Sequence, residues 1–319
     1  MPEDQLVTDG AAIYPEVAAL RAGLAARDWA ACRAVLDHVA PGVRSDLLAG
    51  GSGVDPEFLT AVLRYAPDDA DAAVLLAWHH ITEGWRVRGE SFAAYVDPAA
   101  WPVFHDRLRR AELVLMEAAA RHPGDPAVWR SRLTTGRGLG VGPGEIRRRY
   151  ARLSAIDPHH LGGQRDLLQS LCPKWGGSWD EASRFALDAM RAAPAGGQHG
   201  TLVAELHLER WLDLIADGAG PESDRAIGYL ISGPVLGDLK EAAQRSVLHP
   251  DYRRDFGWVH AMSLFAMLFS LTGNAPAAAR LFTELGPYAS RSPWDRLGPV
   301  VETTVRERRA RAFAEAGIA

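Results

Sequence analysis

The chain has 319 residues, of which 47% are hydrophobic and 24% are charged, and its formal net charge is −5 at pH 7. This composition is typical of a folded globular protein and excludes a disordered chain. The mildly acidic balance argues against nucleic acid as a partner, because nucleic-acid-binding surfaces are basic.

Cysteine content and the N-terminal sequence favour a cytoplasmic location. Cys32 and Cys172 are too few for a disulfide framework and have no metal-ligand spacing. Residues 1–5 are acidic where a secretion signal would be basic. The longest apolar run, residues 262–271, is about half of the ~20 residues that span a bilayer. We therefore expect no membrane partner.

Hydrophobic residues recur every three or four positions along the chain, which predicts helices and no strands. In the N-terminal part, one helix begins at Pro15, and a second, capped by Asp28, covers residues 29–36. A further helix begins at Pro56, where a proline in the first turn costs no hydrogen bond. We assign residues 1–66 to N-terminal helical hairpins.

The region from 67 to 217 contains a sequence repeat in which each unit ends at a proline. Pro123, Pro158 and Pro194 lie 35 and 36 residues apart, each just after a predicted helix. A period near 34 residues with two helices in each unit is typical of tetratricopeptide-like repeats. We therefore predict an all-α fold, a right-handed α-solenoid of tetratricopeptide-like helical hairpins, with this region as its core.

One unit of this core is longer than the others. Pro67 and Pro123 are 56 residues apart, which exceeds one repeat by about 20 residues. We assign the excess to an insertion at residues 84–101, between an apolar helix over about 72–85 and a helix over about 102–122. Insertions in solenoids collect on one face, which is often the binding face.

Two further stretches interrupt the predicted helices. The glycine-rich residues 136–144 are predicted to form a loop, and they follow no strand, so they are not a nucleotide-binding phosphate loop. Residues 172–180 are irregular and lead into a helix whose start is marked by a capping box of Ser178 and Glu181. Residues 218–319 are assigned to C-terminal helical hairpins and a capping helix.

Two short stretches resemble those of a bacterial protein family. Residues 84–89 read Gly-Trp-Arg-Val-Arg-Gly, and residues 173–178 read Pro-Lys-Trp-Gly-Gly-Ser. Both are similar to the signature stretches of a family that is a domain of unknown function with tetratricopeptide-like helices. The resemblance covers roughly residues 70–215. It implies an α-helical repeat fold and supplies no activity or catalytic residue.

The same two stretches hold the side chains best suited to bind a partner. Arginine offers a planar fork for carboxylate or phosphate, and tryptophan offers a stacking or cation–π face. If the two stretches meet, we expect a pocket for an acidic peptide or a small anion. Otherwise they pack structurally, with the basic side chains bonded to loop carbonyls and the acidic ones in salt bridges. The candidate binding residues are Trp85, Arg86, Arg88, Glu90, Lys174, Trp175 and Asp180.

A weaker candidate is a divalent metal site on the helix before the insertion. Glu83 lies four residues after His79 and three after His80, so it shares a helix face with each. The spacing of the zinc-protease signature is absent. The alternative is a partly buried histidine that packs beside Trp78. A further metal ligand would come from elsewhere in the chain: His105, His159 or His160.

These features favour a protein–protein interaction or scaffold module over an enzyme. We expect it to bind a peptide or partner protein in a concave groove lined by residues 84–98 and 172–180, without a cofactor. The alternative is an enzyme, or a small-ligand or metal-binding protein, that uses a pocket between residues 79–98 and 172–180. Serine, cysteine and histidine residues are too scattered to nominate a nucleophile and its base.

Overall fold

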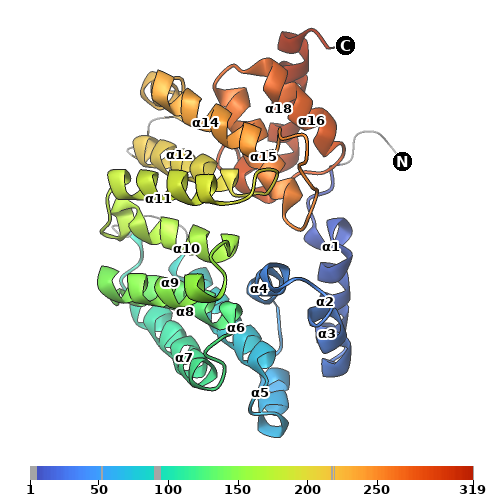
Figure 1. Ribbon diagram of the computed structural model, residues 1–319, viewed down its shortest axis with the longest axis vertical. Coiled ribbons are helices and arrows are strands. Elements are labelled where there is room, and N and C mark those ends of the chain that lie inside the picture. Colours follow the sequence, from blue (N-terminus) through green and yellow to red (C-terminus); the bar gives the residue numbers. More distant parts are fainter. Residues whose placement is uncertain (1–5, 52, 90–94, 217, 219, 319) are drawn as a thin grey trace. The chain divides into compact units, whose positions relative to one another are not determined.

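The computed structural model describes residues 6–51, 53–89, 95–216, 218 and 220–318. Within these ranges the chain is all-helical, as predicted, and its β-type pairing is an isolated bridge between Val7 and Tyr288 (Figure 1). No helix in the described part of the chain is both long enough and apolar enough to cross a membrane.

The chain forms two compact units. The central unit is Pro15–Gly177, and the terminal unit combines Met1–Tyr14 with Ser178–Ala319. The three-part division at residues 66 and 217 that the sequence suggests stays a prediction.

In the central unit, α6 pairs with α7 and α8 pairs with α9, and α8 lies beside both α6 and α10. Helix α4 packs against α6, α8 and α10. The elements of this unit are α2 (Pro15–Ala25), α3 (Trp29–Leu36), α4 (Pro41–Ala49), α5 (Pro56–Tyr65), α6 (Ala70–Arg88), α7 (Ala100–Arg121), α8 (Pro126–Leu139), α9 (Pro143–Ile156), α10 (Leu161–Leu171) and the 3₁₀ helix η2 (Pro173–Trp175).

The terminal unit is built around α15, which is buried along most of its length and packs against α12, α16 and α17. The closing helix begins at Val301 and follows a short helix that ends at Trp294. The elements are α1 (Gly10–Ile13), α11 (Trp179–Ala192), α12 (Gly200–Ile215), α13 (Asp224–Leu230), α14 (Gly233–Arg245), α15 (Trp258–Leu271), α16 (Ala275–Leu285), α17 (Arg291–Trp294) and α18 (Val301–Ala316).

Local sequence signals place many helix starts correctly. The Asp28 carboxylate accepts a hydrogen bond from the Ala31 backbone N–H at 3.0 Å and caps α3. The Ser178 hydroxyl accepts one from the Glu181 backbone N–H at 3.2 Å and caps α11. The helices α7, α9 and α11 end 35 and 36 residues apart, so two helices fall in each predicted period.

The predicted glycine loop at residues 136–144 is wrong at both ends: α8 continues through Leu139 and α9 begins at Pro143, which leaves residues 140–142 as the connection. Gly138 is a helical residue at a close packing contact. A Cβ atom there would lie 2.3 Å from Cδ1 of Leu108, which is buried on α7. The glycine therefore lets two helices approach, and it does not break either of them.

The non-helical part of the predicted insertion at residues 84–101 is shorter than expected. Residues 84–88 continue α6 and residues 100–101 begin α7, which leaves residues 89–99 as the connection. Residues 90–94 of this connection lie outside the described residues.

Candidate functional site

Residues 84–89 and 173–178, the two stretches with candidate binding residues, contribute side chains that meet in the central unit. Trp85, in the last turn of α6, and Trp175, at the end of η2, have ring centroids 6.0 Å apart with an interplanar angle of 85°. This edge-to-face arrangement is a favoured aromatic geometry. Both rings are half-buried, so each keeps some surface open to solvent.

A tight turn brings Trp175 to this position. Pro173 opens η2, and Gly176 ends it in the left-handed region with φ of 87°. A Cβ atom on Gly177 would lie only 2.0 Å from the carbonyl oxygen of Leu171, so the chain folds back closely on the end of α10. Both glycines are therefore required by the backbone, the first for its dihedral angle and the second for the close approach.

Two arginines lie over the tryptophan rings. The guanidinium carbon of Arg88 is 5.4 Å from the ring centroid of Trp85 and 5.5 Å from that of Trp101. The guanidinium carbon of Arg137, on α8, is 5.7 Å from the ring centroid of Trp175. These distances fit cation–π contacts. We call Trp85, Arg88, Trp101, Arg137 and Trp175 the aromatic–arginine cluster.

Hydrogen bonds orient both arginines. Arg88 donates from Nη1 to the carbonyl oxygen of Gly89 at 3.0 Å, which is the loop-carbonyl bond expected of a structural role. Arg137 donates from Nη1 to the backbone carbonyl of Asp166 at 3.1 Å, and its Nη1 lies 3.4 Å from the Asp166 carboxylate. Burial lowers the pKa of Arg88, but a guanidinium stays protonated at neutral pH.

The other predicted binding residues have different surroundings. Arg86 is exposed and pairs with Glu83, with Nη2 2.9 Å from Oε2, and this bond holds the pKa of Glu83 below its ordinary value. Lys174 is exposed on η2, next to Trp175. Glu90 lies outside the described residues, and Asp180 belongs to the terminal unit.

Sequence reasoning missed two members of the cluster. Arg137 fell in the stretch predicted to be a loop. In the helix it lies two turns after Arg130, so both side chains share one face of α8. Trp101 is the second residue of α7, in the stretch assigned to the insertion, and no sequence pattern singles it out.

The proposed metal ligands do not assemble into a recognisable site. The rings of His79 and His80 have centroids 5.4 Å apart, and Glu83 is engaged by Arg86. Burial, together with the charges of His79 and neighbouring arginines, lowers the pKa of His80 to about 4, so its imidazole is neutral at pH 7. Across the described residues, no group of three His, Cys, Asp or Glu side chains is placed to hold an ion. The metal site stays a prediction.

The cluster can bind a negatively charged group beside an apolar surface. Two guanidinium groups lie over half-buried indole rings, and the exposed residue Lys174 directly precedes Trp175 in the chain. Arginine and tryptophan are the residues most often found at the energetic centre of protein interfaces.

Comparisons of the chain with models of known protein families, with curated proteins and with solved structures found no match.

Proposed function

We propose that the protein is an interaction or scaffold module that binds a partner protein or peptide at the aromatic–arginine cluster. The single observation that carries this proposal is the placement of Arg88 and Arg137 over the half-buried rings of Trp85 and Trp175. Partly solvated cations and indole faces are the chemistry by which interfaces anchor a partner.

The proposal includes the finer architecture that the sequence predicts. The helical pairs α6–α7 and α8–α9, and the two-helix period of about 35 residues, support tetratricopeptide-like hairpins in a right-handed α-solenoid. We further propose a location in the bacterial cytoplasm, on the resemblance to the bacterial family. There its two buried cysteines stay thiols.

The partner we expect is an acidic peptide segment that also carries an aromatic or aliphatic side chain. Its carboxylates would pair with Lys174 and Arg88, and its apolar side chain would cover the exposed edges of Trp85 and Trp175. No cofactor is part of this proposal.

The test is a selection of displayed random peptides against the full chain. We expect wild type to enrich acidic sequences that contain an aromatic residue. The affinity of an enriched peptide, measured by fluorescence anisotropy, should fall by about tenfold or more for Lys174→Glu, because the charge reversal repels the peptide carboxylates. Trp175→Ala should weaken the same peptide by a similar factor.

The matched control is Lys240→Glu. Lys174 and Lys240 are the two lysines of the chain, and Lys240 is exposed on α14 in the terminal unit. This control makes the same charge change at a residue that is not part of the cluster, so it should leave the affinity within about twofold. Peptides that bind Lys174→Glu as tightly as wild type would contradict the proposed function, and so would the absence of any enriched sequence.

A further inference from the structure

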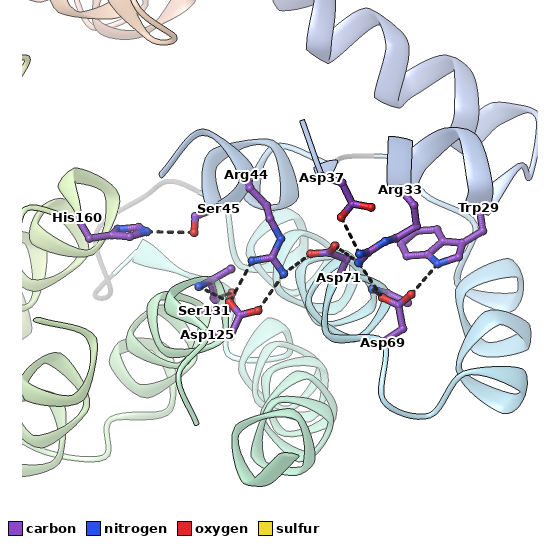
Figure 2. Close-up of polar contacts among 12 residues, drawn as sticks. Trp29, Arg33, Asp37, Arg44, Ser45, Asp69, Asp71, Asp125, Ser131 and His160 are labelled. Carbon is purple, nitrogen blue, oxygen red and sulfur yellow. Dashed lines mark hydrogen bonds and ion pairs between the residues drawn. The ribbon is translucent and has the colours of Figure 1, made fainter. Parts of the chain in front are cut away.

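A second surface of the central unit is occupied by a helix of the same chain. Three consecutive residues of α4 bind side chains of other elements in this unit. Figure 2 shows two of them, Arg44 and Ser45, with their partners. We call the residues that receive α4 the α4 seat, and they come from α6, α8, the N-cap of α8 and the N-cap of α10: Asp71, Asp125, Arg130 and His160.

Arg44 is the anchor of this contact. It donates from Nη1 and Nη2 to the two carboxylate oxygens of Asp125, at 3.2 and 2.8 Å, and it also pairs with Asp71. The fork geometry of a guanidinium on a carboxylate is both strong and specific. Asp125 is held in place because it also caps α8, accepting a hydrogen bond from the Ala127 backbone N–H at 2.8 Å.

Asp71 shows why the seat requires a cation from outside the hairpins. Its side chain is fully buried in the first turn of α6, where an unpaired carboxylate would be very costly. One oxygen pairs with Arg44, and the other accepts a hydrogen bond from Nη1 of Arg33, on α3, at 2.6 Å. Both cations come from the segment that precedes α5, and the carboxylates that bind Arg44 are Asp71 in α6 and Asp125 at the N-cap of α8 (Figure 2).

The next two residues of α4 fix its position. Nε2 of His160 lies 3.0 Å from the Ser45 hydroxyl, and Asp46 accepts a hydrogen bond from Nη1 of Arg130 at 2.6 Å. Beyond them, Leu47 and Leu48 are buried. Arg44, Leu47 and Leu48 stand at positions i, i+3 and i+4 of α4, so they share one face, as the anchors of a helix bound in a groove do.

We infer that α4 is a tethered ligand, and that the α4 seat is a recognition site for an arginine-bearing amphipathic helix of a partner protein. The partner helix carries an arginine at the position of Arg44 and a leucine pair at the positions of Leu47 and Leu48, and it binds by displacing α4. This site is distinct from the aromatic–arginine cluster, so it adds a basic helical partner to the acidic one proposed above.

The tether explains why a partner must compete for the seat. A ligand joined to its site by a short connection has a high effective concentration, on the order of mM. The connection after α4 is short, because α4 ends at Ala49 and α5 begins at Pro56. A free helix of equal intrinsic affinity therefore binds weakly until α4 is released.

The test uses the full chain and a synthetic peptide of residues 38–51 labelled with a fluorophore. Arg44→Glu places a carboxylate against Asp71 and Asp125 and should release α4 from the seat. We expect the peptide to bind this variant at least ~10-fold more tightly than wild type, because the intramolecular competitor is lost. A peptide with glutamate in place of its arginine should bind neither protein.

The matched control is Arg64→Glu, which reverses an exposed arginine on α5 and should bind the peptide as wild type does. Circular dichroism shows whether each variant is folded. A folded Arg44→Glu variant with the affinity of wild type would overturn the inference. So would a variant that becomes a stable dimer, because α4 of a second copy would then be the occupant.

Hydrogen exchange of the unmodified chain gives an independent measurement if Arg44→Glu does not fold. A saturating amount of the peptide should increase deuterium uptake across residues 41–49 of the protein, because displaced α4 loses its protection. Unchanged uptake at these residues, at peptide concentrations of several mM, would overturn the inference.

Discussion

His160 shows how one buried side chain can act in two places at once. Its Nδ1 accepts a hydrogen bond from the Gly163 backbone N–H at 3.0 Å and caps α10, so its Nε2 carries the proton that is donated to Ser45. The bond from Gly163 requires the neutral ring, because a protonated Nδ1 cannot accept it. Burial, and then the positive charge of Arg130, lower the pKa of His160.

This lowered pKa predicts a loss of stability in mild acid. Above the ordinary histidine pKa of about 6.5 both the folded and the unfolded chain hold a neutral ring. Below it the unfolded chain binds a proton that the folded chain resists, so the free energy of unfolding falls by up to ~1.4 kcal/mol per pH unit. Urea unfolding at about pH 7 and pH 5 measures the loss.

His160→Asn is the variant that isolates this effect, because asparagine keeps a capping oxygen and does not titrate. We expect its free energy of unfolding to fall less between these two pH values than that of wild type. His38→Asn, at an exposed site, is the control and should behave as wild type. Equal pH dependence of wild type and His160→Asn would contradict the assignment.

The backbone at Gly177 makes a second prediction for a single residue. Gly177→Ala places a methyl group against the Leu171 carbonyl, so we expect a loss of more than about 1 kcal/mol in the free energy of unfolding. Gly144→Ala, in the first turn of α9 where nothing lies within 4 Å of the added atom, should be neutral or slightly stabilising. A loss of the same size in both variants would argue against the close approach.

Among the helices, a buried carboxylate joins α7, α8 and α9. Glu112 on α7 accepts hydrogen bonds from Arg132 on α8 and Arg149 on α9, each at 2.8 Å, and from the Thr135 hydroxyl at 2.5 Å. Glu112 is 9% exposed and Arg149 is 5% exposed, so little water can replace a missing partner. The network sets how these three helices are packed together.

Removing this carboxylate leaves Arg149 buried with part of its charge unpaired. We therefore expect Glu112→Ala to lower the free energy of unfolding by about 3–5 kcal/mol. Glu117→Ala breaks an exposed pair with Arg121 on the same helix and should cost less than about 1 kcal/mol. Comparable losses in the two urea titrations would show that the network contributes no more than a surface pair.

Local chemistry explains which elements could be predicted from sequence. Asp28 and Ser178 lie within three residues of the N–H groups they cap, so their role is readable from neighbouring residues. Gly138 was misassigned because its role depends on Leu108, thirty positions away in the chain. No local pattern reports that kind of packing.

The two sites differ in how far they could be predicted from sequence. Trp85 and Trp175 could be nominated because their residue types suit binding, but their contact depends on the turn through Gly176 and Gly177. The α4 seat was missed entirely, although an aspartate stands just before α6 and α8 as it does before α3. Those N-caps were the available signal, and only the fold shows that Arg44 reaches one of them.

At the scale of the whole molecule, the buried carboxylates of the central unit find their described ion-pair partners within that same unit. The cations for Asp71 and Glu112 come from residues between Pro15 and Gly177. We therefore expect a fragment of residues 15–177 to fold alone, with a helical circular dichroism spectrum and a cooperative thermal transition. A fragment that lacks such a transition would show that this unit depends on the rest of the chain.

Asp166 couples the two sites of the central unit, because its carboxylate lies beside an arginine of each. Its carboxylate lies 3.5 Å from Nε of Arg130, which binds Asp46 of α4, and 3.4 Å from Nη1 of Arg137, which lies over Trp175. One negative charge thus serves two cations that belong to different sites. An anion bound at Arg137 would compete with Asp166 for that guanidinium, and the freed carboxylate would change how firmly Arg130 is held against α4. Because free energy is a state function, displacement of α4 must change the affinity for that anion by the same factor.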